Sequence, residues 1–85
     1  MSRALIALPK NSIQRREQDT ISLLQMLQKK GFKEQPFEKP FRVFTYGFNT
    51  VKFNVRDAIA FHNGKEFRGV QYGDIIAHIE KELSN

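Results

Sequence analysis

The 85-residue chain contains no cysteine, and this absence excludes two kinds of small protein. Neither a disulfide framework nor a cysteine-based zinc site can form. The two histidines cannot complete a structural zinc shell without carboxylates. No apolar run approaches the roughly 20 residues of a membrane span, and the sequence holds no glycine-rich phosphate loop and no nucleophile elbow. We therefore expect no metal, no cofactor and no membrane, and we identify no catalytic residue.

The residues that are present indicate one small folded domain. Hydrophobic residues make up 40% of the chain and charged residues 27%, and eight Phe with two Tyr are too many for a solvated tail. Met1 to Leu8 hold one Arg and a short apolar run that ends before Pro9, which is too small for a secretory signal. We expect an intracellular, cytoplasmic protein.

Basic residues outnumber acidic ones. Fourteen Lys and Arg against nine Asp and Glu give a net charge of +5. The excess lies in residues 1–18 and 41–70, whereas residues 71–85 are acidic. A basic surface favours polyanionic partners such as DNA or RNA. Many ordinary small proteins carry a similar excess, so the charge indicates a class of partner without establishing it.

The N-terminal part differs in pattern from the rest of the chain. We divide the sequence into residues 1–18, an arm that leads into a basic helix start, and residues 19–85, a single small α+β domain. Ala4–Leu8 is a continuous apolar run that fits two interpretations, a buried strand or an arm that orders on a partner. The helix that follows begins near Ser12 or near Asp19.

Two helices are predicted at the ends of the α+β domain. Ile21, Leu24 and Leu27 fall at helical spacing and predict a core-facing stripe. Gly31 suits the C′ position of this helix. A last helix begins at Asp74 and carries the apolar residues Ile75, Ile76, Ile79 and Leu83.

Alternating residues between these helices predict strands. Phe41–Tyr46 and Thr50–Val55 form a hairpin around the three-residue turn 47–49. One long strand then extends from Thr50 to His62, with a bend near Arg56, into a second hairpin. The expected architecture is a two-layer α+β fold of α-β-β-β-α order with a three-stranded antiparallel meander, to which the N-terminal run adds a candidate strand.

The second hairpin is predicted to turn at Asn63, Gly64 and Lys65. Three-residue turns in both hairpins place nearly every large apolar residue on the odd-numbered face, which the helices would cover. A two-residue turn at Asn63-Gly64 remains an alternative, and it would oppose Phe61 to Glu66.

In the preferred register the even-numbered side chains form an open face. Basic groups there can neutralise phosphates, and flat aromatic rings can stack on bases. The candidate nucleic-acid-binding residues on this face are Arg42, Phe44, Tyr46, Lys52, Arg56 and Arg68. Arg15 and Arg16 add an electrostatic arm. The alternative interpretation is an ordinary polar sheet face, or one that a second subunit buries.

Two short strings resemble the HicA family of mRNA interferase toxins. The first extends from Leu23-Leu24 to Gly31-Phe32, a helix that ends in Gly-Phe just before the sheet. The second is His62-Asn63-Gly64-Lys65-Glu66, followed by Gly73 and a final helix. The resemblance covers about residues 20–84 and implies a fold like that of double-stranded-RNA-binding domains, with α-β-β-β-α order.

The chain departs from that family where the chemistry lies. The family places a catalytic His after Gly-Ser on its first strand, and the matching stretch here is Lys39-Pro40-Phe41-Arg42. RNA-binding relatives of this fold often present Lys near the final helix, where this chain has Asp74 and Glu80. The resemblance therefore implies the fold and not the ribonuclease activity.

Three hypotheses for the function follow. The leading one is a small basic nucleic-acid-binding protein, regulatory in role, that uses the open face of its sheet. The alternative is a protein–protein interaction module, as an inhibitor, adaptor or small assembly subunit, that pairs or dimerises through its N-terminal strand. A HicA-like nuclease with a displaced site would use His62 opposite Glu66, but a general acid–base pair also needs a pocket that the sequence does not indicate.

Overall fold

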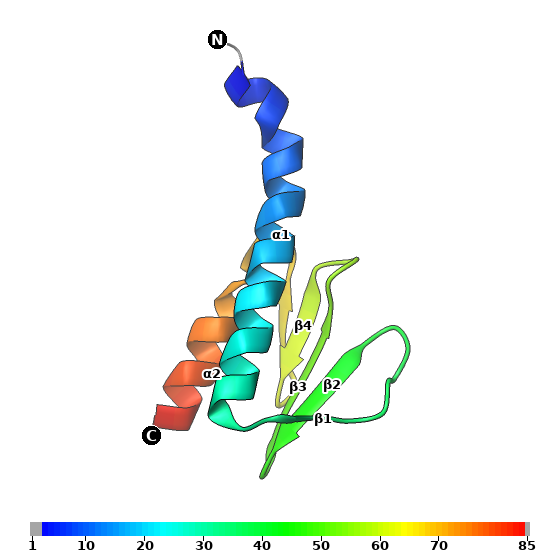
Figure 1. Cartoon of the computed structure of the whole chain (residues 1–85), viewed down its shortest axis with the longest axis vertical. Helices are drawn as coiled ribbons and strands as arrows, with labels where there is room; N and C mark the ends of the chain where they lie inside the picture. The colour runs from blue at the N-terminus through cyan, green and yellow to red at the C-terminus, as the bar shows by residue number, and fades with distance from the viewer. Residues whose placement is uncertain (1–2, 85) are drawn as a thin grey trace.

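The structure, a computed structural model, describes the backbone of residues 3–84 and the side chains of residues 14–84. This part of the chain forms, in order, α1 (Arg3–Lys30), β1 (Lys33–Glu34), β2 (Arg42–Tyr46), β3 (Asn49–Asn54), β4 (Ile59–His62), β5 (Lys65–Arg68), the 3-10 helix η1 (Gly69–Gln71) and α2 (Asp74–Ser84). The five antiparallel strands lie side by side in chain order, and both α-helices pack on one face of the sheet (Figure 1). The predicted two-layer α+β fold is confirmed, with five strands where three were expected.

The N-terminal segment belongs to a helix. α1 begins at Arg3, so the backbone of Ala4–Leu8 is helical and the predicted extra strand is wrong. Ala and Leu are among the strongest helix formers, and a run of them extends a helix unless a sheet edge is free to pair with it. α1 also continues without a break across residues 18 and 19, where we divided the sequence.

The buried stripe of α1 is made by different residues from the predicted stripe. Leu23, Met26 and Leu27 are buried, whereas Leu24 is only partly buried and Ile21 is 48% exposed. Residues three and four apart share one face of a helix, so Leu23 and Leu27 define the line that meets the sheet. Ile21 therefore lies outside the core.

The C-terminal end of α1 is built as predicted. Gly31 has a φ of 96°, a conformation that glycine adopts without strain. The Phe32 N–H donates to the Leu27 carbonyl at 2.9 Å, and the Gly31 N–H donates to the Gln28 carbonyl at 3.1 Å. This pair of hydrogen bonds is a Schellman motif, and it directs Phe32 into the core.

Both hairpins have two-residue turns, so the predicted register is wrong. Tyr46 pairs with Asn49 across Gly47-Phe48, and His62 pairs with Lys65 across Asn63-Gly64. Positive φ values of 52° and 91° at Asn63 and Gly64 match a type I′ turn, whose twist suits a tight hairpin. A slip of one residue moves every side chain of the partner strand to the other face of the sheet.

The expected long strand from Thr50 to His62 is two strands. Asn54 reverses the chain, because its Oδ1 accepts the Arg56 N–H at 3.1 Å and its Nδ2 donates to Asp57 Oδ2 at 2.9 Å. Ala58 completes the turn with a φ of 53° and an N–H that donates to the Val55 carbonyl. An Asn side chain that bonds nearby backbone is a strong turn signal. The fold-back creates the pairing of β3 with β4.

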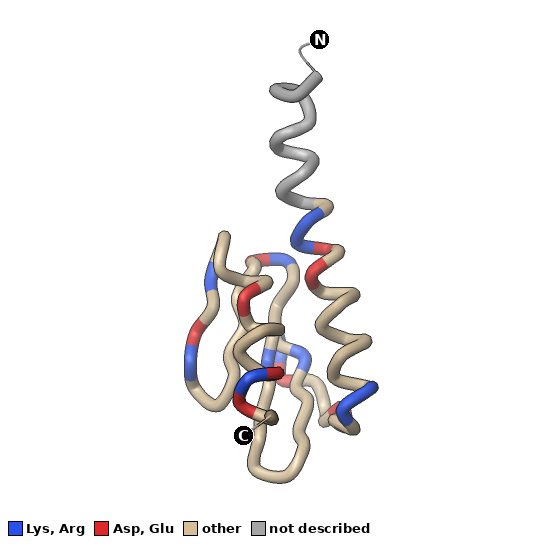
Figure 2. Tube along the Cα trace, turned by 90° about the vertical axis from the view of Figure 1, so that its left-hand side faces the viewer, with Lys and Arg blue, Asp and Glu red and all other residues tan. Residues whose placement is uncertain are grey.

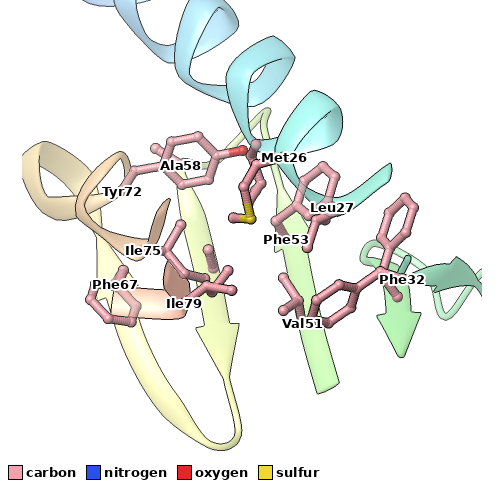
Figure 3. Packing of buried hydrophobic residues seen from close by; sticks show 13 residues of the cluster. Met26, Leu27, Phe32, Val51, Phe53, Ala58, Phe67, Tyr72, Ile75 and Ile79 are labelled. Atoms are coloured by element: carbon pink, nitrogen blue, oxygen red, sulfur yellow. The ribbon is translucent and has the colours of Figure 1, made fainter. Parts of the chain in front are cut away.

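The core fills the space between the two helices and the covered face of the sheet (Figure 3). α2 contributes Ile75 and Ile79, as predicted, and the Phe44 and Phe53 rings stack at a centroid distance of 5.7 Å. The fully described cluster consists of Leu23, Met26, Leu27, Phe32, Phe44, Val51, Phe53, Ala58, Ala60, Phe67, Tyr72, Ile75 and Ile79. Even-numbered residues of β2 and β4 and odd-numbered residues of β3 and β5 therefore point inward.

A buried hydroxyl pair joins α1 to the segment before α2. Thr20 Oγ1 donates its proton to the Arg16 carbonyl at 2.9 Å, so it accepts the proton of the Tyr72 hydroxyl at 2.7 Å. Burial raises the pKa of Tyr72, and the hydrogen bond to Thr20 opposes that shift. The pair fixes α1 along the start of α2.

The register makes a prediction about two phenylalanines that lie four residues apart. Phe44 is 4% exposed and Phe48 is fully exposed, so replacing Phe44 with Ala should lower the free energy of unfolding by about 3 kcal/mol or more. Phe48→Ala is the matched control, because it removes the same ring atoms from a position that faces solvent. Urea unfolding followed by circular dichroism measures both. Equal, small losses in the two variants would place Phe44 on a solvent-facing surface and contradict the register.

Candidate functional site

The eight residues that the sequence suggested for nucleic-acid binding do not share one face. They occupy the helix-covered face (Arg42 and Phe44), one end of the sheet (Tyr46), the face that neither helix covers (Lys52 and Arg68) and the region where α1 meets the β3–β4 turn (Arg15, Arg16 and Arg56). The split follows from the register. The even-numbered side chains of β2 share a face with the odd-numbered side chains of β3, whereas the prediction placed even with even.

Arg42 and Phe44 stabilise the first strands. The Arg42 guanidinium lies over the rings of Phe44 and Phe53, at 5.4 Å and 5.8 Å from their centroids. Two of its nitrogens donate to the two carboxylate oxygens of Glu34 on β1, each at 2.9 Å. This hydrogen bonding lowers the pKa of Glu34. The bidentate pair joins β1 to β2, and the cation–π contacts place the guanidinium plane over the rings of β2 and β3.

Tyr46 lies at the end of the sheet where α1 terminates. Its ring is 5.4 Å from that of Phe32, and its edge approaches Gly31. About half of the side chain, 47%, remains exposed. Tyr46 therefore covers the helix end and is separated along β2 from the basic residues with which it was grouped.

The face that neither helix covers carries a different set of side chains from the predicted one. Directly opposed residues of an antiparallel pair point to the same face, as do residues two apart along a strand. Lys52 opposes Phe61, which opposes Glu66, and Ile59 opposes Arg68. We call this surface the open face; Val43 and Asn54 on it are buried, and its other residues are Phe41, Thr45, Thr50, Lys52, Ile59, Phe61, Glu66 and Arg68.

An aromatic groove lies in the open face. The Phe41 and Phe61 rings meet edge to face, with centroids 5.8 Å apart and an interplanar angle of 71°. The groove has a volume of about 260 Å³ and is lined by Phe41, Thr50, Lys52, Phe61, Asn63 and Gly64. Sites for whole small molecules typically enclose roughly 300–1,000 Å³, so this groove is slightly smaller than such a site.

The two cations of the open face each have an acidic neighbour. Lys52 Nζ lies 3.2 Å from Glu38 Oε1 in the loop between β1 and β2, and Arg68 pairs with Glu66 beside it on β5. All four side chains are at least 40% exposed. Exposed ion pairs of this kind contribute little free energy, so an incoming anion can exchange with the carboxylates.

A second basic region lies where α1 passes the β3–β4 turn. Arg16 Nη1 donates to the Arg56 carbonyl at 2.9 Å, which brings the two arginines together from positions 40 residues apart. Arg15 precedes Arg16 and is exposed, and the start of η1 lies at the same end, where the Gly69 N–H donates to the Ala58 carbonyl. Acidic residues lie between the basic ones along the described chain (Figure 2).

A histidine pair inside the molecule was missed by the sequence analysis. His62 of β4 is completely buried, and its Nδ1 lies 2.9 Å from Nδ1 of His78 on α2. Its Nε2 lies 3.3 Å from Asn49 Oδ1. The expected partner Glu66 opposes Phe61 and points to the other face, so an acid–base pair of His62 with Glu66 is excluded by the register.

The backbone N–H of Thr50 determines which ring nitrogens of the two histidines carry a proton. The Thr50 N–H must meet an oxygen, so the atom of Asn63 it contacts at 2.8 Å is Oδ1. Asn63 Nδ2 then donates to Asn49 Oδ1, which can only accept, so His62 carries its proton on Nε2. His62 Nδ1 is left as an acceptor, and the Nδ1–H of His78 donates to it.

Burial lowers the pKa of His62, and the adjacent His78 lowers it further, while Glu82 acts weakly in the opposite direction. A proton added to His62 Nδ1 would face the Nδ1–H of His78 at hydrogen-bond distance. The pair therefore favours a neutral His62. With its ring fully buried, His62 offers no atom to an external substrate in this structure.

Two further observations bear on the kinds of site this fold offers. Among the residues whose side chains the structure describes, no three His, Asp or Glu side chains gather as ligands for a metal ion. Within the described helices, none is both long enough and apolar enough to span a membrane.

The chain matches no protein-family model, and no curated protein or solved structure is detectably similar to it. Its function must accordingly be inferred from the geometry of its own residues.

The histidine pair makes stability depend on pH. Because His62 has a lowered pKa in the folded protein, the unfolded chain, where His titrates near about 6.5, binds more protons. The contribution is present above about pH 6.5 and is lost as the pH falls through the folded pKa. Urea unfolding between about pH 7.5 and 5 should show decreasing stability, in a range above the titration of Glu34.

Nitrogen-15 NMR of the histidine rings tests the same prediction directly. At neutral pH the His62 signal should be that of the Nε2–H tautomer, with a pKa below that of free histidine. An Nδ1–H tautomer, or a pKa at or above the ordinary value, would contradict the assigned network.

Proposed function

We propose that the chain binds single-stranded nucleic acid through its open face. The observation that carries the proposal is the Phe41–Phe61 pair, which lines a groove beside Lys52 on the face that neither helix covers. Aromatic rings on a sheet surface stack on unpaired bases, and each such stack is worth about 1–3 kcal/mol. A groove of about 260 Å³ has room for one base.

The two aromatic rings that line the groove favour a single strand over a duplex. Bases in a duplex are stacked on one another, so a ring inside a groove reaches only a base that is already unpaired. Lys52 lines the groove itself and is placed to meet the phosphate that accompanies a bound base. Stacking and charge then act on the same nucleotide.

Beyond the groove, arginine side chains are available to the backbone of the bound nucleic acid. Arg68 opposes Ile59 at the end of the open face, and the turn after β3 carries Arg56 against Arg16 of α1. Arginines in such positions neutralise backbone phosphates without reading sequence. We leave Arg42 and Phe44 out of the interface, because they contact Glu34 and the core.

The N-terminal segment, as far as the structure describes it, supplies no strand for the alternative function. Pairing through an N-terminal edge strand requires extended backbone, and Ala4–Leu8 lies inside α1. The resemblance to HicA toxins implies the fold and supplies no catalytic group. We therefore propose binding rather than cleavage, with RNA and DNA compared in the experiment.

Replacing Phe61 with Leu should weaken binding about fivefold or more, because Leu keeps apolar bulk in the groove and loses the flat ring. Phe48→Leu is the matched control on an exposed turn. Anisotropy with labelled single-stranded RNA and DNA of about 12 nucleotides, at several salt concentrations, measures the affinities. The proposal fails if wild-type protein does not bind at low salt, or if the two variants bind equally.

A further inference from the structure

We infer that Glu38 competes with the phosphate for Lys52 at this site and that its release lets residues 38–41 move and widen the groove. The inference rests on the proposed function and concerns how the same site is regulated. Its starting point is the 3.2 Å contact between Glu38 Oε1 and Lys52 Nζ, the one cation that lines the groove. A carboxylate in this place occupies the position where a phosphate oxygen would bind.

The loop that carries Glu38 is hydrogen-bonded to Phe41, one of the two rings that line the groove. Glu38 and Phe41 exchange two backbone hydrogen bonds: the Glu38 N–H donates to the Phe41 carbonyl at 3.1 Å, and the Phe41 N–H donates to the Glu38 carbonyl at 2.7 Å. These bonds make residues 38–41 one tight unit. A displacement of Glu38 therefore carries Phe41 with it.

Phe41 in turn limits access to Phe61. The two rings meet edge to face at 5.8 Å, so a movement of Phe41 changes how much of the Phe61 ring a base can cover. The contact between Lys52 and Glu38 adds a small preference for this position of residues 38–41, because the pair is exposed. A phosphate that captures Lys52 releases the loop, and the base of the same nucleotide gains the ring of Phe61.

The outer end of the loop is free to make this movement. Both carboxylate and ammonium groups are exposed, with 60% and 40% of their side chains accessible. The fixed point of the loop lies nearer β1, where the Gln35 N–H donates to the Val43 carbonyl at 2.8 Å and Gln35 Nε2 donates to Thr45 Oγ1 at 2.9 Å. Residues 38–41 can therefore shift without unpairing β1 from β2.

Glu38→Gln tests the inference, because glutamine keeps the shape of the side chain and removes its charge. Binding of the single-stranded oligonucleotide should tighten about two- to fivefold, the range expected for an exposed ion pair. The salt dependence should also steepen, since a freed Lys52 releases a bulk counterion when it meets phosphate. Glu80→Gln, on the exposed side of α2, is the control for the change in net charge.

A double-variant cycle separates the ion pair from a general charge effect. In a Lys52→Gln background the gain from Glu38→Gln should disappear, because no cation remains for the carboxylate to block. A gain that persists in that background, or one no larger than that of Glu80→Gln, overturns the inference while the proposed function stands. If neither the wild type nor Glu38→Gln binds RNA or DNA, both are overturned.

Discussion

The register of the two hairpins is the constraint on which the rest of the molecule depends. Gly47-Phe48 and Asn63-Gly64 close their hairpins in two residues, and the alternation of side chains along each strand follows from these turns. With this register Phe44, Phe53 and Phe67 meet the helices in one layer. A three-residue turn in either hairpin would exchange the faces of the next strand and expose part of that layer.

The same register determines what the surface can do. It turns His62 into the core, where its Nδ1 meets His78 and its Nε2 meets Asn49, and it turns Phe61 and Lys52 outward together. A buried polar pair has to be fully hydrogen-bonded, and here the Asn63 and Asn49 amides complete the chain from the Thr50 backbone. The tight second turn thus positions both the interior network and the rim of the groove.

The open face combines weak ion pairs with a half-buried aromatic pair, Phe41 and Phe61. Surface pairs such as Lys52 with Glu38 add little to the stability of the fold. They nevertheless hold a loop whose Phe41 lies on the groove. In the proposed binding, an anion that replaces the Glu38 carboxylate would change the groove at small cost, because the core holds the strands underneath.

Local chemistry allowed the sequence to determine the α+β class, the end of α1 at Gly31 and the apolar stripe of α2, since propensity, capping and helical spacing act within a few residues. The turn at Asn54 and Asp57 carried a local signal that was outweighed by the alternation around it. Only the tertiary structure decided which face of each strand is buried. Odd and even faces both hold large apolar residues, and a side-chain period of two makes the alternatives equivalent until the helices cover one of them.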